Sequence, residues 1–584
     1  MKFIKFFDRT FLFAIIASLL YRVSFAPYNY SFCIWLVSGI WGILIYDPSS
    51  WKVQRYVKVW CGTFLFWGWA FNWMFYPPIW TKLLWGGFTI SLSFFIPLFI
   101  LLGRIALHHI KSISPYILLP IVWCGCEFLR KNFFFGGMSY GAIEHTQFQN
   151  IYLIQIADII GENAVGMLII FIGVCIAAFW KSLNEFQNKP NFLHFSQKSL
   201  RILLFAISVI LCVFSYGYYQ IHSPKINANF YPDAPHVKIA LLQGNLNATI
   251  EPYCKTFTER MNQYHQLSNE ISQSVDVVVW PEEFCFPGFY VFSSNFLPTE
   301  WKNQSNEQVK EMLDQLICTN RKEFHEFANE NNTPQIVGLF TRYFCEKIYE
   351  KSMPHYKFSA VFIEPGVGVK YIYNKHHLVP FLEYNPFSFL TPEKFQKNFF
   401  LYRGHELTAF PLFSKNNRLY QKSSYPLYAA INICFDSAFA SSIRQQVRNL
   451  SEQNQEPDVL ISMSNDGSFD MLTQIEMHTA TYVFRSIENR KPYLASCNSG
   501  FAVWIDKTGR MIKKGKWNEA TSIIAEIKKE TPTRCVYYYC GDCFSWGCLT
   551  FNLVLLITGI WRSRFITTVF GAIECRKIRG QKRG

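Results

Sequence analysis

The sequence predicts a polytopic α-helical membrane domain followed by a layered α/β domain. Half of the 584 residues are hydrophobic and 18% are aromatic, whereas 17% are charged, below the roughly 25% of soluble domains. The first 222 residues are a succession of long apolar stretches. From about residue 236 onward, short β-like runs alternate with helical stretches, which is typical of α/β layers.

The membrane domain, residues 1–222, is expected to contain about seven transmembrane helices. Each candidate stretch has about the length that crosses a bilayer: 10–26, 30–46, 59–75, 84–106, 114–129, 160–180 and 201–219. The fifth stretch is short and contains Pro115 and Pro120. The basic N-terminus could instead begin a signal peptide, but no cleavage-site pattern follows it and further apolar stretches come at once.

The distribution of basic residues predicts the orientation. They gather in alternate connections, namely the N-terminus, 47–58, the turn around Arg104 and Lys111, and 181–201. Connections 27–29 and 76–83 carry almost no basic residues. Arg130 and Lys131 are an exception to the alternation, because they lie on the side opposite to the basic connections. The basic connections are therefore expected in the cytoplasm, and an odd number of spans places the following domain on the outer face.

A last apolar run, 544–561, is expected to form a C-terminal transmembrane helix, and the basic tail 562–584 would return to the cytoplasm. The formal net charge of +15 is dispersed along the chain or lies beside apolar segments. It therefore favours membrane orientation over nucleic-acid binding. Seventeen cysteines are an odd number, and many lie inside apolar runs, so they do not indicate a disulfide framework.

Residues 236–530 are expected to form the α/β domain. The β-like runs are Val237–Leu242, Val275–Trp280, Ile336–Phe340, Phe358–Ile363, Leu427–Ile433, Val459–Met463, Tyr493–Ser496, Phe501–Ile505 and Ile523–Ile527. Helical stretches are expected at 254–272, 307–331 and 470–487. The sequence pattern does not fix how the strands are ordered.

Cys434 is the first candidate for chemistry, because it ends the apolar run Leu427–Ile433. Phe439, Ile443 and Val447 recur every four residues after it, so a helix is expected to begin immediately beyond the cysteine. A helix N-terminus favours an anion such as the nucleophilic thiolate. The alternative is that Cys434 is a small buried hydrophobic residue.

Two possible partners follow other strand-like runs. Glu282 comes after VDVVVW, and Lys375 follows Tyr371–Asn374. A carboxylate could accept the proton of the thiol, and a cation could stabilise the thiolate and then an oxyanion. His376 and His377 have no metal-ligand companions at suitable spacing, so no metal and no other cofactor is expected.

The motifs WPE, NKHHLVPFLEY and ICFD, in this order, resemble the Glu-Lys-Cys triad of the nitrilase superfamily. They are most similar to the apolipoprotein N-acyltransferases, whose lysine motif is similar to KRHLVPFGEY. LLQGN at 241–245 and SNDGSF at 464–469 resemble two further motifs of this family. The resemblance implies a nitrilase-like αββα sandwich, with Glu282 as proton acceptor, Lys375 as oxyanion stabiliser and Cys434 as nucleophile.

The resemblance also suggests supporting residues. Glu383 matches a glutamate that helps orient the lysine or assists the base, and a solvated surface glutamate is the alternative. Asp436 stands where the family has Glu, one methylene longer. Glu127 and Arg130, at the edge of an apolar span, could be functional or could be an interfacial ion pair that only positions the span. Cys285 lies near Glu282 but between Phe284 and Phe286, which favours a structural role.

The implied activity is the last step of lipoprotein maturation in the bacterial inner membrane. A phospholipid would give one acyl chain to Cys434, and the thioester would acylate the N-terminal amine of a diacylated lipoprotein. The catalytic domain would lie on the periplasmic face, with both termini in the cytoplasm. One alternative is a membrane-tethered nitrilase-type amidohydrolase that uses water. Another is a transporter or scaffold with a decayed nitrilase domain, which the presence of all three triad residue types disfavours.

Overall fold

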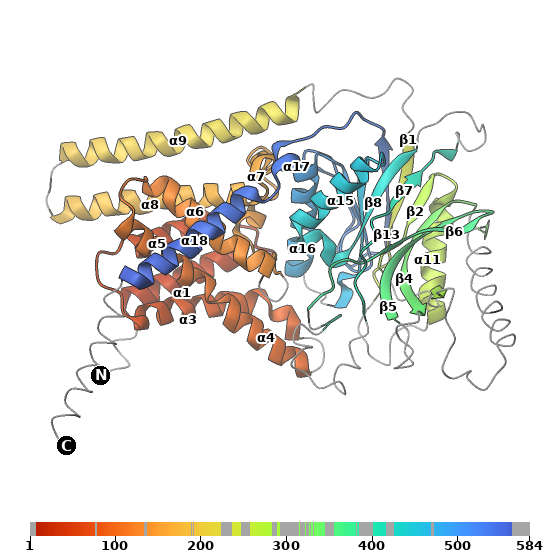
Figure 1. Cartoon of the computed structure of the whole chain (residues 1–584), viewed down its shortest axis with the longest axis horizontal. Coiled ribbons are helices and arrows are strands. Elements are labelled where there is room, and N and C mark those ends of the chain that lie inside the picture. Colours follow the sequence, from red (N-terminus) through yellow and green to blue (C-terminus); the bar gives the residue numbers. More distant parts are fainter. Residues whose placement is uncertain are drawn as a thin grey trace, which may run out of the picture.

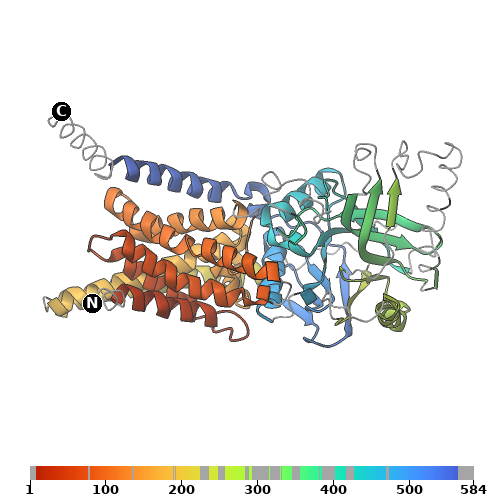
Figure 2. The ribbon, with the colours of Figure 1, turned by 90° about the horizontal axis from the view of Figure 1, so that it is seen from below.

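The computed structural model describes residues 8–75, 79–133, 137–188, 192–223, 236–246, 257–282, 289–292, 332–344, 355–380, 382–384, 401–415, 426–468 and 472–562, with single residues between some of these ranges. A bundle of helices forms one half of the molecule and a two-sheet sandwich forms the other (Figures 1 and 2). We call residues 8–223 together with α18 the membrane half. Residues 236–530 are the sandwich.

The membrane half has a helix at each expected apolar stretch. Its helices are α1 (Arg9–Val23), α2 (Cys33–Tyr46), α3 (Val53–Ala70), α4 (Ile79–Leu92), α5 (Phe95–His109), α6 (Pro115–Phe133), α7 (Ala157–Ile160), α8 (Asn163–Asn188), α9 (Phe192–His222) and α18 (Cys543–Arg562). The expected stretch 84–106 is broken at Ser93 and Phe94. The expected stretch 114–129, by contrast, lies within one helix, α6, despite Pro120.

Small residues let these helices approach closely. A Cβ on Gly62 of α3 would lie 2.7 Å from the Cβ of Ala14 in α1, and one on Gly173 of α8 would lie 2.6 Å from the Ser38 carbonyl oxygen of α2. A Cβ on Gly125 of α6 would come within 2.6 Å of the Cys548 carbonyl oxygen of α18. Such contacts are typical of helices that pack in lipid. The C-terminal helix thus belongs to the same bundle as the first helices of the chain (Figure 2).

The chain is a membrane protein. Among the described residues, Trp85–His109, Asn163–Asn188 and Phe192–His222 are long and apolar enough to cross a bilayer, and Cys33–Tyr46 and Cys543–Gly559 are shorter apolar helices. Only 6% of the most apolar window of Phe192–His222 is buried against protein, so most of its apolar surface is not covered by the rest of the described chain. The full set of spans and their orientation stay predictions.

The described part of the sandwich has two sheets. The first sheet runs β13 (Thr521–Lys528), β1 (His236–Gln243), β2 (Val277–Val279), β4 (Gln335–Phe344), β5 (His355–Glu364) and β6 (Gly368–Asn374), with β3 (Phe289–Phe292) also paired to β4. The second runs β12 (Met511–Lys514), β11 (Val503–Ile505), β10 (Tyr493–Cys497), β9 (Val459–Ser464), β8 (Leu427–Ile433) and β7 (Ala409–Leu412). Strands β8, β9 and β10 are parallel neighbours, and their nearly continuous burial is typical of such strands.

Helices cover both outer faces, so the expected αββα sandwich is confirmed. Apolar side chains of both sheets, such as Ile239 and Ile461, form the core between them. Helix α11 (Phe257–Ser272) packs on the first sheet. Helices α15 (Ala440–Glu452) and α16 (Leu472–Asn489) lie between the second sheet and the membrane half (Figure 1). Of the expected helix at 307–331, the structure describes only Gln315, Lys322, Glu326, Asn329 and Glu330, which are helical, and the basic tail after 562 lies outside the described ranges.

Candidate active site

The three predicted triad residues follow three strands of the sandwich. Glu282 comes shortly after β2 and Lys375 directly after β6, both in the first sheet, whereas Cys434 comes directly after β8 in the second. Gly338 of β4 allows this arrangement, because a Cβ there would lie 2.6 Å from the Pro281 carbonyl oxygen and 2.9 Å from Glu282 Cα. Because Glu282 and Lys375 follow strands of the first sheet and Cys434 follows a strand of the second, the two facing sheets both contribute side chains to one edge of the sandwich.

Lys375 is the centre of the charged cluster. Its Nζ lies 3.0 Å from Glu282 Oε1 and 2.7 Å from Glu383 Oε1, and the lysine is 0% exposed. Burial lowers the pKa of Lys375, but the carboxylates of Glu282 and Glu383 outweigh it and hold this pKa well above its ordinary value. Lys375 is therefore a permanent ammonium.

Cys434 lies next to this cluster and starts as a thiol. Burial and the nearby Glu282 charge raise the pKa of Cys434 well above its ordinary value, although Lys375 acts in the opposite direction. Its backbone has φ +48°, a conformation that non-glycine residues rarely adopt outside functional sites and turns. A nucleophilic Cys434 thus needs a base to take its proton.

The helix that begins at Cys434 is not the expected α-helix. Cys434–Ala438 forms a 3-10 helix, and α15 begins only at Ala440. The Asp436 carboxylate accepts the Ile433 N–H at 3.0 Å, which closes the turn, and the extended Phe439 interrupts the helical conformation. An α-helix N-terminus therefore does not act on the thiol.

Glu383 is not a solvated surface residue. Besides Lys375, its carboxylate accepts the Val379 N–H at 2.8 Å, so it closes the loop that follows the lysine. Burial, offset only in part by Lys375 and increased by the charge of Glu282, raises the pKa of Glu383 to about 7. This agrees with the implied role of orienting the lysine.

The raised pKa of Glu383 predicts a pH-dependent stability. The folded state favours the protonated carboxyl, so this contribution is fully present below the ordinary glutamate pKa and is lost as the pH rises through about 7. We expect the thermal unfolding temperature of the wild type to fall between pH 5 and pH 8 relative to that of Glu383→Gln. Thermal scans in detergent measure the difference, and parallel pH profiles of the two proteins would contradict the assignment.

Asp436 is a buried anchor between the two loops. Its Oδ1 accepts the N–H groups of His376 at 3.2 Å and His377 at 2.7 Å, and its Oδ2 accepts the Tyr373 hydroxyl at 3.0 Å. With Ile433, four donors thus face one carboxylate. The aspartate ties the chain beyond Lys375 to the turn that begins at Cys434.

Glu127 and Arg130 form a buried ion pair with an additional contact. Arg130 Nε lies 3.0 Å from Glu127 Oε2, and Arg130 Nη1 donates to the carbonyl oxygens of Met138 at 2.8 Å and Tyr140 at 3.0 Å. The ring of Tyr140 is 6.0 Å from that of Phe435, centroid to centroid. The pair therefore supports a loop that reaches the turn after Cys434, and it does not contact the triad itself.

Two groups of residues were missed by the sequence reasoning. Asp466 and His478 lie beneath the Cys434 turn, with His478 Nε2 3.1 Å from the Cys434 carbonyl oxygen. Asp466 belongs to the motif SNDGSF, but nothing in the sequence links this motif to a histidine on α16. The second group joins the two halves, with Glu162 Oε2 2.6 Å from Arg485 Nη2 of α16.

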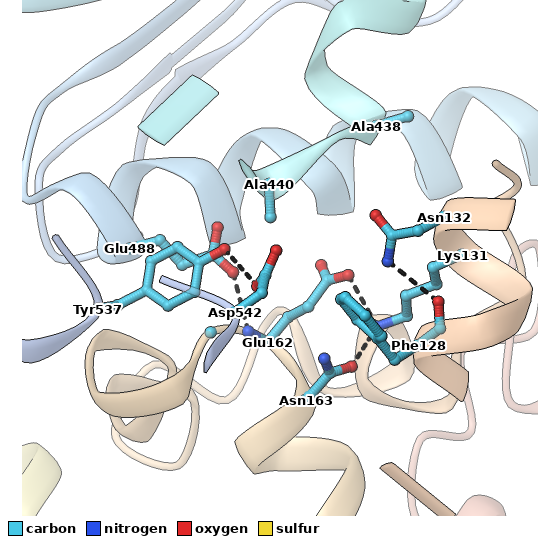
Figure 3. A pocket seen from close by; sticks show the side chains of 11 residues that line it. Phe128, Lys131, Asn132, Glu162, Asn163, Ala438, Ala440, Glu488, Tyr537 and Asp542 are labelled. Atoms are coloured by element: carbon cyan, nitrogen blue, oxygen red, sulfur yellow. Dashed lines mark hydrogen bonds and ion pairs between the residues drawn. The ribbon is translucent and has the colours of Figure 1, made fainter. Parts of the chain in front are cut away.

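A small pocket lies at this junction. Glu162 and Asn163 point toward Lys131, whose Nζ is 2.8 Å from an oxygen of each (Figure 3). The lining is Phe128, Lys131, Asn132, Gly161, Glu162, Asn163, Ala438, Ala440, Glu488, Tyr537 and Asp542. The pocket does not include the triad. In the described ranges, no cluster of three or more His, Cys, Asp or Glu side chains is arranged to hold a metal ion.

Comparisons with known proteins agree with the architecture. Residues 17–175 match the family model of the apolipoprotein N-acyltransferase N-terminal domain, and residues 238–535 match that of carbon-nitrogen hydrolase. The chain is 25% identical to an apolipoprotein N-acyltransferase of Geobacter metallireducens, over 75% of this chain and 73% of the relative. Identity is 24% to apolipoprotein N-acyltransferase 1 of Treponema denticola, over 83% and 88% of the two chains. It is 23% to the apolipoprotein N-acyltransferase of Haemophilus influenzae, over 91% and 92%. The chain belongs to the carbon-nitrogen hydrolase family, in its apolipoprotein N-acyltransferase branch.

Proposed function

We propose that this protein transfers an acyl chain from a phospholipid to the N-terminal amino group of diacylglyceryl-cysteine lipoproteins. The observation that supports it most is the cluster at the sandwich edge, where the Lys375 ammonium lies 3.0 Å from Glu282 Oε1 beside the Cys434 thiol. The family models match both halves of this chain, and the relative of Haemophilus influenzae aligns with 91% of it. A lipid acyl donor suits a cysteine enzyme whose active-site domain rests on a membrane bundle.

In the first half-reaction, Glu282 accepts the Cys434 proton as Sγ bonds to the ester carbonyl carbon. The carbonyl electron pair moves to oxygen, and Lys375 stabilises the resulting oxyanion. When the tetrahedral intermediate collapses, the ester C–O bond breaks and the lysophospholipid oxygen takes the proton from Glu282. Cys434 then carries the acyl group as a thioester.

In the second half-reaction, the lipoprotein amine attacks the thioester and Glu282 accepts one of its protons. Collapse forms the amide and releases the Cys434 sulfur, which recovers the proton from Glu282. The two substrates therefore react in turn, with ping-pong kinetics.

The orientation is part of the proposal. The charge count places residues 236–530 on the outer, periplasmic face and both termini in the cytoplasm. We expect a reporter that is active only outside the cytoplasm to be active when fused within the sandwich and silent when fused at Gly584. The reverse pattern would contradict the charge count and the access to outer-leaflet substrates.

The decisive experiment uses purified protein, a phospholipid and a diacylated lipopeptide. Mass spectrometry should find the triacylated lipopeptide, and without an acceptor it should find one acyl chain on the peptide containing Cys434. If the thioester forms but passes to water with no preference for the amine, the protein is a membrane-tethered amidohydrolase. If no acyl-enzyme forms, the proposed function fails.

Asp436 offers a test of the anchor between the loops. An asparagine there presents one acceptor oxygen and one NH₂ group to the four donors, so buried N–H groups lose their partners at a cost of about 1–3 kcal/mol each. We expect Asp436→Asn to lower both the unfolding temperature and turnover, whereas Asp436→Glu keeps a carboxylate and loses less. Full activity in both variants would show that the anchor does not serve the reaction.

A further inference from the structure

A buried polar network holds the carbonyl group of Cys434. His478 Nδ1 lies 2.9 Å from Asp466 Oδ1, and His478 Nε2 lies 3.1 Å from the Cys434 carbonyl oxygen. His478 is 0% exposed and Asp466 is 3% exposed. The Ser437 hydroxyl also donates to the Cys434 carbonyl, at 3.1 Å. Two side chains thus fix one peptide oxygen directly after the nucleophile.

Fixing this oxygen also fixes the N–H group of the next residue. The peptide bond between Cys434 and Phe435 is trans, so its C=O and N–H groups point in opposite directions. With the oxygen directed at His478, the Phe435 N–H is directed away from it. In the part of the chain that the structure describes, the Phe435 N–H has no acceptor. It is therefore available to an oxyanion formed at Cys434.

A carboxylate and a carbonyl can only accept hydrogen bonds, so the imidazole is the group that donates in a hydrogen bond to either of them. Burial raises the pKa of Asp466, but His478, Gln474 and Cys497 together bring it below its ordinary value.

The arrangement is not a second catalytic site. Ser437 Oγ lies 3.0 Å from His478 Nε2, which with Asp466 gives the spacing of a serine–histidine–aspartate relay. However, Ser437 is 0% exposed, so a lipid carbonyl cannot reach it. The contact to the Cys434 carbonyl is the feature that connects the network to the reaction.

The membrane half in turn fixes the helix that carries His478. At the start of α16, Arg22 donates to the Thr473 hydroxyl at 3.1 Å, and toward its end Arg485 pairs with Glu162 at 2.6 Å. Both contacts join residues more than 300 positions apart in the sequence. The position of His478 is therefore fixed from both ends of the helix.

We infer that His478, held by Asp466, is a positioning residue that orients the Cys434–Phe435 peptide so that the Phe435 N–H and Lys375 together stabilise the oxyanion. This rests on the proposed acyl transfer. The network takes part when Sγ bonds to the ester carbon and the carbonyl electron pair moves to oxygen. It does not accept the thiol proton, which goes to Glu282.

Two reactions of the same thiol test the inference. Acylation by phospholipid passes through a tetrahedral oxyanion, whereas alkylation by iodoacetamide is a direct displacement without one. We expect His478→Leu to slow acylation of Cys434 about 10²–10³-fold, the loss typical of one oxyanion donor, and to leave alkylation close to wild type. His478→Gln keeps an N–H donor toward the carbonyl and should recover most of the acylation rate. Thr479→Val, on the same helix turn, is the matched control and should change neither rate.

Each outcome decides the inference. If acylation and alkylation fall together in folded His478→Leu, the network merely supports the nucleophile loop, and the inference is wrong. It is also wrong if neither rate changes. If His478→Leu does not fold, Asp466→Asn takes its place, because it keeps the volume and an acceptor but removes the charge opposite the imidazole. A wild-type protein that is alkylated but never acylated would instead reject the proposed function.

Discussion

Cys434→Ala is expected to form no acyl-enzyme and no triacylated lipopeptide. In the proposed reaction the thiol forms the covalent intermediate, and we expect no other nucleophile among the described residues to replace it. Cys497 and Ser437 are nearby but 1% and 0% exposed. Phospholipid supplied without an acceptor should add one acyl mass to wild-type Cys434, and neutral hydroxylamine, which cleaves thioesters, should remove it.

Two further cysteine variants make this result specific. Cys434→Ser keeps the size of the side chain but replaces the thiol by a far weaker nucleophile, so acylation should be slow and the product should be an ester. Cys540→Ser removes an exposed cysteine of α17 (Val536–Cys540) and should be fully active. Triacylated product from Cys434→Ala, or an acyl group on Cys285 in the wild type, would end the assignment.

The sequence predicted the positions of most strands, because each expected run is mostly apolar. All nine expected β-runs contain a strand. The strands that were not expected, β3, β7 and β12, are four residues long. β7 contains Pro411 and β12 is largely exposed. Such strands form because a neighbouring strand offers hydrogen bonds, and a single-sequence pattern does not contain that information.

The sequence predicted the site residues that belong to the recognised motifs. Glu282, Lys375 and Glu383 come together as expected, although Lys375 and Glu282 are 93 residues apart. The turn after Cys434 could not be predicted, because its shape depends on Asp436 bonding across to His376 and His377. The pKa of Cys434 follows from burial between the sheets, which the helix pattern alone does not reveal.

Lys375→Met is expected to affect catalysis and stability separately. Loss of one oxyanion donor costs about 10²–10³ in rate, and loss of the cation that favours the thiolate adds to it. The same change leaves Glu282 and Glu383 facing each other without a cation, and breaking a buried pair in this way costs about 3–5 kcal/mol. We therefore expect both a large loss of acylation and a lower unfolding temperature.

The double variant Lys375→Met/Glu383→Gln separates these two effects. Glu383→Gln removes one of the two uncompensated charges and keeps an acceptor for the Val379 N–H, so the unfolding temperature should largely recover. Acylation should stay at the level of Lys375→Met, because no cation faces the oxyanion. Glu282→Gln should lose acylation and iodoacetamide alkylation in parallel, because the base acts on the thiol in both reactions. If acylation recovers with stability in the double variant, Lys375 is only the structural partner of two carboxylates.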